Sequence, residues 1–305
     1  MPYACFTTLL QDAADKQCSL AECIQTREAT ESDTSVTQVR ARLAEILAVM
    51  REAVRQGSQP DIKSRTGLTG GDAARLFDSV NRPDSVNVIG PLFTHILAAS
   101  MATVELNAAM GRIVAAPTAG ASGVLPGAFL TLLHEHDLDD DTLIDGLLVA
   151  GAIGACFAAQ ATLSGAAGGC QAEVGTAAAM TAAAVTYMLW PREESASSTA
   201  AANEAVNEAL GHAASFAIQG QLGLVCDPVA GLVEIPCIAR NATGTAVALA
   251  GAQMALSGLK FPLPFDEVVD AAARVGAAIP PSLRETAKGG LAITPTAKRI
   301  RRELR

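Results

Sequence analysis

The strongest constraint on the fold is a stretch without charge near the middle of the chain. No Asp, Glu, Lys or Arg occurs from Gly146 to Gly169, a run of 24 residues. Such a segment must be buried in a protein core or in a bilayer, and it exceeds the roughly 18 apolar residues that suggest a membrane span. It is mostly Ala and Gly, contains Gln160 and Ser164, and has neither a Trp/Tyr belt nor a flanking Lys/Arg cluster. We therefore expect a buried central helix and no membrane partner, with a membrane span as the alternative.

The apolar residues of this chain are small. Half of the 305 residues are apolar, yet only 4% are aromatic, and 26 are Gly. This composition favours closely packed helices over a β-sandwich. No apolar/polar alternation is long enough to indicate a strand. The sequence therefore predicts an all-α protein, a single multi-helix domain whose Gly-rich loops converge.

Periodicity places the helices. Apolar residues from Val36 to Val54 recur at helical spacing and predict a helix over 33–55, with Ser32 or Asp33 as its N-cap. Further helices are expected at 72–80, 92–110, from Val124, and at about 142–163, 173–190, 202–221, 242–257 and 265–277. Residues 191–201 are expected to form an exposed loop, and the basic end from Lys298 to Arg305 to lie in solvent. We expect residues 1–56 to form a helical N-terminal layer and 57–297 to form the core.

Charge and cysteine content exclude several classes of protein. The net charge of −9 and the pI of about 5.0 give no indication of a nucleic-acid partner. Seven cysteines, an odd number at uneven spacing, argue against a secreted disulfide framework. The N-terminus lacks the basic region and apolar core of a signal peptide. We expect a cytoplasmic protein.

Three cysteines, Cys170, Cys226 and Cys237, lie in glycine-rich, nearly uncharged segments. Their separations of 56 and 11 residues match neither a ferredoxin nor the paired C-x-x-C spacing of structural zinc. Spacing alone leaves simple burial as the alternative, but the adjacent glycines and prolines fix irregular backbone that a packing cysteine would not require. Thiolates on such loops suit a 4Fe–4S cluster, and three protein ligands would leave one iron open as a Lewis acid. The other four cysteines are interpreted as core or incidental: Cys5, Cys18, Cys23 and Cys156.

Two further loops, Thr66–Asp72 and Pro117–Gly123, carry small residues, hydroxyls and free N–H groups, and each precedes a predicted helix. The orphan amides and the helix dipole favour an anion, so a carboxylate or phosphate would fit there. The alternative is a tight turn with helix caps. Neither loop is a P-loop, because the Gly-Lys-Ser ending and a preceding strand are absent. The residues expected to bind a substrate are Thr66, Thr69, Gly70, Gly71, Thr118, Gly120, Ser122 and Gly123.

Acid–base groups are sparse in this sequence. The four histidines are expected in the core or on helix surfaces, so polar residues beside the special loops are better candidates for proton transfer. The candidates for catalysis are Glu173, Asp72 and Asn107, and Glu105, Asp227 and Glu234 lie beside the same loops. Neither Lys63 nor Lys288 has a convincing pyridoxal-phosphate context, so no Schiff base is expected.

The loops form five long motifs: Thr-Gly-Leu-Thr-Gly-Gly-Asp (66–72), Asn-Ala-Ala-Met-Gly-Arg-Ile-Val-Ala-Ala-Pro-Thr-Ala-Gly-Ala-Ser-Gly (107–123), Gly-Ala-Ala-Gly-Gly-Cys-Gln-Ala-Glu-Val-Gly (165–175), Gly-Leu-Val-Cys-Asp-Pro-Val-Ala-Gly-Leu-Val-Glu-Ile-Pro-Cys (223–237) and Gly-Gly-Leu-Ala-Ile-Thr-Pro-Thr (289–296). In this order, and over nearly the whole chain, they resemble the α chain, or catalytic domain, of the iron–sulfur L-serine dehydratases.

The resemblance implies an all-α catalytic domain with a 4Fe–4S cluster on Cys170, Cys226 and Cys237. It also implies conversion of L-serine to pyruvate and ammonia without pyridoxal phosphate. The open iron would make the serine hydroxyl a better leaving group, the small-residue loops would hold the carboxylate, and a base would remove the α-proton.

The chain departs from the family in three ways. The connection between Cys170 and Cys226 looks longer than is usual, with the extra residues expected at 191–205. No cysteine follows Cys237, so the fourth iron is expected to be free or water-bound. The regulatory β domain, which in the family carries a Ser-Ser-His-Thr-type segment facing the cluster, is absent, so we expect a separate β chain to complete the site.

Two alternatives remain open. A cluster-dependent lyase could act on L-cysteine or L-threonine instead, because a methyl or sulfur difference changes binding by only about 1–3 kcal/mol. A non-enzymatic helical module could hold zinc, or nothing, on its cysteines. Either way, a chain this rich in small apolar residues is expected to form an oligomer.

Overall fold

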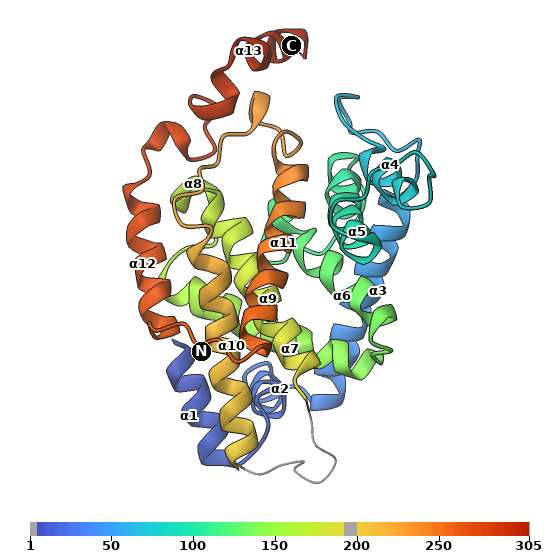
Figure 1. Ribbon diagram of the computed structural model, residues 1–305. Coiled ribbons are helices and arrows are strands. Elements are labelled where there is room, and N and C mark those ends of the chain that lie inside the picture. Colours follow the sequence, from blue (N-terminus) through green and yellow to red (C-terminus); the bar gives the residue numbers. More distant parts are fainter. Residues whose placement is uncertain (1–4, 192–199, 305) are drawn as a thin grey trace.

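The computed structural model describes residues 5–191 and 200–304, which contain thirteen α-helices and no β-strand (Figure 1). The all-α prediction is confirmed. The helices are α1 (Phe6–Lys16), α2 (Leu20–Glu31), α3 (Val36–Gly57), α4 (Asp72–Ser79), α5 (Pro91–Ala108), α6 (Val124–Glu135), α7 (Asp140–Gln160), α8 (Gly165–Gly168), α9 (Thr176–Leu189), α10 (Ala200–Gln219), α11 (Cys237–Leu256), α12 (Phe265–Ala278) and α13 (Pro295–Glu303).

The centre of the bundle is α9, and α6, α7, α10 and α11 pack around it (Figure 1). Every residue of α9 from Thr176 to Met188 is buried. A helix that is apolar on all sides belongs inside a protein. Because six of its fourteen side chains are Ala, the surrounding helices can approach its backbone closely at these positions.

Glycine permits the closest helix contacts. A Cβ on Gly251 of α11 would lie 2.8 Å from the carbonyl oxygen of Ala213 in α10, and a Cβ on Gly57 of α3 would collide with the carbonyl of Ala102 in α5. Neither contact can form with a larger residue without moving a helix. The small-residue composition is therefore a requirement of this packing.

The charge-free stretch forms most of α7. This helix is the one in the described residues that is long and apolar enough to cross a membrane, and 67% of its most apolar window is buried in the bundle. It begins at three aspartates, where the Asp139 side chain accepts a hydrogen bond from the Thr142 N–H (2.8 Å). The buried central helix expected here is observed, although it ends at Gln160 rather than at 163.

Several helix boundaries differ from the predictions. The prediction of Ser32 or Asp33 as the N-cap of α3 is wrong: Ser35 is the cap, and it forms a capping box with Gln38. Ser32 instead caps the end of α2. The Ser-x-x-Gln pattern at 35–38 satisfies two orphan N–H groups at once, which the earlier positions cannot do.

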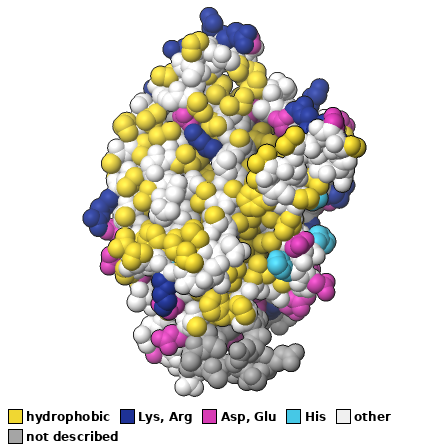
Figure 2. Space-filling model, in the orientation of Figure 1, with side chains coloured by type: hydrophobic (Ala, Val, Ile, Leu, Met, Phe, Trp, Pro, Cys, Tyr) yellow, Lys and Arg dark blue, Asp and Glu magenta, His cyan; other side chains and the backbone are white. Residues whose placement is uncertain are grey.

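The other differences lie near the ends of the chain and at α11. Helix α11 begins at Cys237, five residues before the predicted start. The basic end is exposed as expected, but much of it is helical: Figure 2 shows Lys and Arg side chains gathered where α13 lies. Of the loop predicted at 191–201, residues 192–199 lie outside the described residues, and Pro191 is exposed. The division into a layer 1–56 and a core 57–297 stays a prediction.

Helix α1 is capped by a residue from the other end of the chain. Its first N–H groups, those of Phe6 and Thr7, donate to the Asp266 carboxylate of α12 (2.8 and 3.0 Å), and so do the Thr7 hydroxyl (2.6 Å) and Gln160 Nε2 (3.1 Å). Burial alone would raise the pKa of Asp266, but these hydrogen bonds outweigh it and lower the pKa. The carboxylate thus serves as the N-cap that the local sequence of α1 lacks.

We expect Asp266→Ala to lower the free energy of unfolding by about 1–2 kcal/mol, the effect of removing a helix cap. The charge contributes stability above the ordinary Asp pKa of about 4 and loses it as the pH falls through the lowered pKa. Denaturant unfolding between pH 7 and pH 3 checks this: Asp266→Asn should show a smaller acid loss than the wild type. The control is Asp270→Asn, a half-exposed residue of α12 paired with Arg274; an equal effect there would contradict the capping role.

Candidate active site

The three cysteines of the predicted cluster lie at one end of the bundle. Cys170 stands just before the π-helical turn Gln171–Gly175 that leads into α9, Cys226 lies in the loop after α10, and Cys237 is the first residue of α11. Cys170 and Cys226 share a small buried apolar cluster. The charge of Cys170 acts on both other thiols, so the structure brings the three into electrostatic range of one another.

Burial raises the pKa of all three thiols, that of Cys170 to about 11 and that of Cys237 to about 12, and that of Cys226 further. For Cys226 and Cys237 the neighbouring cysteines add to the effect, while the Arg240 charge acts in the opposite direction on Cys170 and Cys237. A cation held between them would reverse this balance, because metal binding deprotonates a thiol.

Within residues 5–191 and 200–304, no three His, Cys, Asp or Glu side chains come close enough to hold a single metal ion. In a 4Fe–4S cluster each cysteine binds a different iron, so the ligands need not meet at one point. Two buried thiols and a partly buried one, in electrostatic range of one another, are a donor set that suits such a cluster.

Glu173 connects the cysteines to the loop Pro117–Gly123. Its Oε1 accepts a hydrogen bond from the Thr118 hydroxyl (2.8 Å), and its Oε2 lies 3.9 Å from Cys226 Sγ. Burial raises the pKa of this carboxyl group. Among the three residues proposed for catalysis, Glu173 is the one that the structure places in contact with a cysteine.

The loop Pro117–Gly123 is held in place by Asn241 of α11. The Gly123 N–H donates to Asn241 Oδ1 (2.9 Å), and Asn241 Nδ2 donates to the Gly120 carbonyl (2.7 Å). Ser122 is fully buried, and its hydroxyl has no hydrogen-bond partner among the described residues. Asn107 Nδ2 donates weakly to the Ala119 carbonyl (3.4 Å), which places it beside the same loop.

In the loop Thr66–Asp72 the predicted anion-binding donors already bind carboxylates of the chain. The hydroxyls of Thr66 and Thr69 donate to Glu234 (2.8 and 2.7 Å). The N–H groups of Gly71 and Asp72 donate to Glu105 (3.0 and 2.9 Å). The carboxylates that this loop binds in the structure therefore belong to the chain itself.

The loop Thr66–Asp72 contains two further predicted site residues, Gly70 and Asp72. Gly70 has φ +135°, and a Cβ there would approach the Lys63 backbone to 2.8 Å, so the position requires glycine. Asp72 forms an ion pair with Arg75 on the outer side of α4. A role for these loop residues with a substrate stays a prediction.

The remaining two motifs meet at Asp227. Its carboxylate pairs with Arg240 (2.8 Å) and accepts a hydrogen bond from the Leu291 N–H (2.6 Å). The second contact attaches the 289–296 motif beside Cys226. Glu234 binds Thr66 and Thr69 of the first motif, and Asn241 binds Gly120 and Gly123 of the second. These contacts join the first two motifs to the chain around Cys237, so all five motifs converge, as predicted.

Arg240, Asn241 and Gln171 were not among the residues predicted to be functional. Gln171 connects the Cys170 turn to the Cys226 loop, because its Oε1 accepts from the Gly223 N–H (2.7 Å) and its Nε2 donates to Ala272 of α12 (2.6 Å). One signal was available: Arg240 is the sole charged residue of α11, which is otherwise uncharged from Cys237 to Leu256. Because burying an unpaired charge is costly, a lone Arg in such a helix indicates a specific partner.

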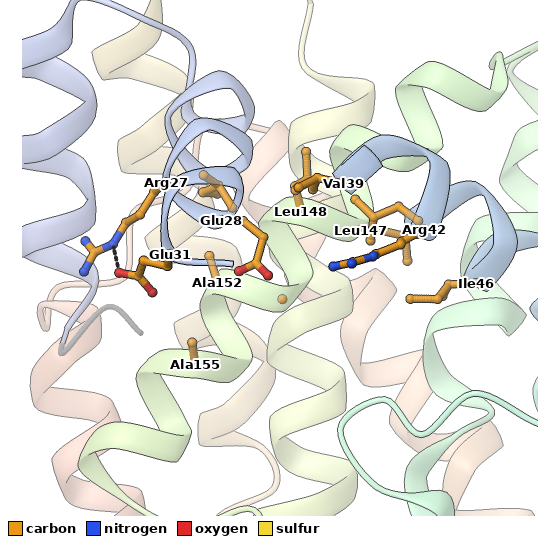
Figure 3. Close-up of a pocket in the computed structure, with 13 residues that line it drawn as sticks. Arg27, Glu28, Glu31, Val39, Arg42, Ile46, Leu147, Leu148, Ala152 and Ala155 are labelled. Atoms are coloured by element: carbon orange, nitrogen blue, oxygen red, sulfur yellow. Dashed lines mark hydrogen bonds and ion pairs between the residues drawn. The ribbon is translucent and has the colours of Figure 1, made fainter. Parts of the chain in front are cut away.

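A separate cavity of about 350 Å³ lies between α2, α3 and α7 (Figure 3). Its floor includes Leu147 and Leu148, and charged side chains including Glu28 and Arg42 stand around it. None of the three cysteines lines this cavity. It is not part of the candidate active site.

Residues 15–292 match the family model described as serine dehydratase alpha chain. The chain belongs to this family. The resemblance inferred from the five motifs is therefore confirmed.

Individual relatives agree with the family. The probable L-serine dehydratase, alpha chain, of Bacillus subtilis is 38% identical over 296 residues, which cover 97% of this chain and 93% of the relative. The L-serine dehydratase, alpha chain, of Peptoniphilus asaccharolyticus is 40% identical over 277 residues, or 90% of this chain and 89% of the relative. L-serine dehydratase 1 of Escherichia coli K12 is longer: a 37% identical match covers 69% of this chain but only 43% of that protein.

We expect Gly165→Ala to destabilise this serine dehydratase alpha chain family member by about 1–3 kcal/mol, as overpacking does. A Cβ at position 165 would lie 3.2 Å from Cys226 Sγ and would collide with the Glu173 carboxylate. Denaturant unfolding measures the loss. The matched control is Gly151→Ala in α7, where a Cβ would meet nothing within 4 Å. Equal stability of the two variants would show that Glu173 is not held against Gly165.

Proposed function

We propose that this chain is the catalytic chain of an L-serine dehydratase, which converts L-serine to pyruvate and ammonia with a 4Fe–4S cluster on Cys170, Cys226 and Cys237. The observation that carries the proposal is that these three thiols, two buried and one partly buried, lie in electrostatic range of one another where the five loop motifs converge. Membership of the serine dehydratase alpha chain family supports the same substrate. We also propose the cytoplasm as its location, where reducing conditions keep thiols free.

When bound, the cluster would supply a Lewis-acidic iron toward the serine hydroxyl, the leaving group. The chain's own residues would bind and orient the substrate. The loop Pro117–Gly123 offers the unpaired Ser122 hydroxyl and the start of α6, and both suit a carboxylate. Loss of water from serine gives 2-aminoacrylate, whose tautomer hydrolyses to pyruvate and ammonia.

Glu173 is the strongest of the three candidates for proton transfer. It lies beside Cys226 and beside the proposed carboxylate loop, and its carboxylate can accept a proton. Asp72 is engaged with Arg75 away from the cysteines, and an amide such as Asn107 cannot act as a base. Glu173 can therefore act at the substrate, whereas Asn107 can only orient.

Iron content tests the cofactor. We expect the anaerobically purified or reconstituted chain to hold about four irons and four sulfides, the composition of a 4Fe–4S cluster, and to lose its brown absorbance in Cys170→Ala, Cys226→Ala and Cys237→Ala. The matched controls are Cys156→Ala and Cys23→Ala, which alter buried cysteines elsewhere in the core. If the chain holds no iron after reconstitution, the proposed cluster mechanism is wrong. Rates on L-serine, L-threonine and L-cysteine then identify the substrate.

A partner chain is the second part of the proposal. The relatives that this chain nearly spans are named alpha chains, whereas longer relatives are named simply L-serine dehydratase, and the chain spans 43% of one and 61% of another. The part of those longer relatives that the match leaves uncovered is the size of a further domain. We propose that a separate β chain supplies it and completes the site, in an oligomer.

We expect the loaded chain alone to dehydrate L-serine slowly and the addition of a β-type chain to raise kcat, because the site lacks a histidine from this chain. The His134 and His136 side chains are exposed, the His95 ring lies against Phe77, and His212 Nδ1 accepts a hydrogen bond from the Phe261 N–H (3.2 Å). Steady-state rates with and without the added chain measure this. Full activity of the loaded chain alone would exclude the requirement.

A further inference from the structure

Side chains at the start of α11 contact two different loops of the candidate site. Cys237 begins the helix, and the adjacent side chains of Arg240 and Asn241 extend to different loops of the candidate site. Within five residues, this helix carries one proposed cluster ligand and two side chains that bind different loops, and it has no charged residue besides Arg240. The contacts of each side chain indicate what it positions.

Arg240 is directed to the cysteine loop. Its Nη1 donates to the Val225 carbonyl (2.8 Å), and its Nη2 pairs with Asp227 (2.8 Å), so it holds both neighbours of Cys226. The ion pair is secluded: the side chains of Arg240 and Asp227 are 15% and 3% exposed. A guanidinium remains charged at any physiological pH, so it places a permanent positive charge beside thiols that would carry negative charge in a cluster.

Asn241 is directed to the loop Pro117–Gly123. It is fully buried, it accepts from the Gly123 N–H, and it donates to the carbonyls of Gly120 (2.7 Å) and Cys237 (2.9 Å). It therefore fixes the distance between this loop and the helix turn that carries the third cysteine. In the described part of the chain, none of its hydrogen bonds involves Val225, Cys226 or Asp227.

We propose that Arg240 and Asn241 are positioning residues with separate tasks: Arg240 fixes and electrostatically balances the cysteine ligands, and Asn241 sets the substrate-binding loop against them. This inference rests on the proposed function. Groups that hydrogen-bond around metal ligands commonly change metal retention 10–100-fold when they are lost. Loss of the Arg240 side chain should therefore change the retention and the midpoint potential of the cluster, and loss of the Asn241 side chain should change the KM for L-serine.

The experiment compares two variants with two matched controls. Arg240→Gln removes the charge, and Arg284→Gln removes another arginine that binds backbone carbonyls nearby without an ion pair. Asn241→Ala removes the loop contacts, and Thr245→Val removes an equally buried hydrogen-bonding group one turn further along α11. Each reconstituted protein is assayed for iron loss to a ferrous chelator, for the midpoint potential of the cluster, and for KM and kcat per cluster in the active form.

For Arg240→Gln we expect iron loss at least about tenfold faster and a more negative midpoint potential, because a positive charge near the cluster favours its reduced form. Arg240→Lys keeps the charge and should restore the potential, which a purely structural role would not predict. For Asn241→Ala we expect a KM for L-serine raised about tenfold, with iron retention and potential as in the wild type.

Wild-type potential and iron retention in Arg240→Gln, or wild-type KM in Asn241→Ala, would overturn the division of tasks. Equal losses in the control variants would overturn it too, since they would indicate general destabilisation. If the wild type itself takes up no iron, the proposed function fails, and this inference fails with it. A loaded wild type with unchanged variants would overturn this inference alone.

Discussion

The structure depends on the close approach of helix backbones, which only Ala and Gly permit at this density. The α9 helix can be buried on every side because its neighbours meet Ala side chains at six of its fourteen positions. Glycines such as Gly251 then let pairs of surrounding helices touch at the backbone. Close packing makes a core of this kind rigid, and the helix ends, with the loops that join them, are consequently held at fixed positions.

At the loop end, the organising interactions are hydrogen bonds to buried or partly buried carboxylates. Glu105, Glu173, Asp227 and Glu234 each accept hydrogen bonds from a loop distant in sequence. A carboxylate that receives such donors ties two segments more strongly than a neutral acceptor would. Of these carboxylates, Glu173 acts on Cys170 and Cys226, and Asp227 follows Cys226 and pairs with Arg240. This explains why a helix without other charges retains one arginine in its first turn.

The sequence predicted those features that depend on local pattern. The apolar stripe at 33–55 identified a helix, and the charge-free stretch identified a buried one, because periodicity and burial are properties of neighbouring residues. The cap at Ser35 was missed because several hydroxyl and carboxyl residues precede that helix. Contacts such as Thr66 with Glu234, which are 168 residues apart, leave no trace in spacing. The motifs therefore predicted that the loops converge, but not which groups join them.

The two predicted anion loops are not equivalent in the folded chain. In the loop Thr66–Asp72 the available donors already bind Glu105 and Glu234, so a substrate carboxylate would have to displace one of them. In the loop Pro117–Gly123 the buried Ser122 hydroxyl has no partner among the described residues. A buried polar group without a partner costs free energy, which a bound ligand can recover. This difference supports the proposal that the second loop binds the substrate, while the contacts of Thr66 and Thr69 with Glu234 hold the first loop against the Cys226–Cys237 segment.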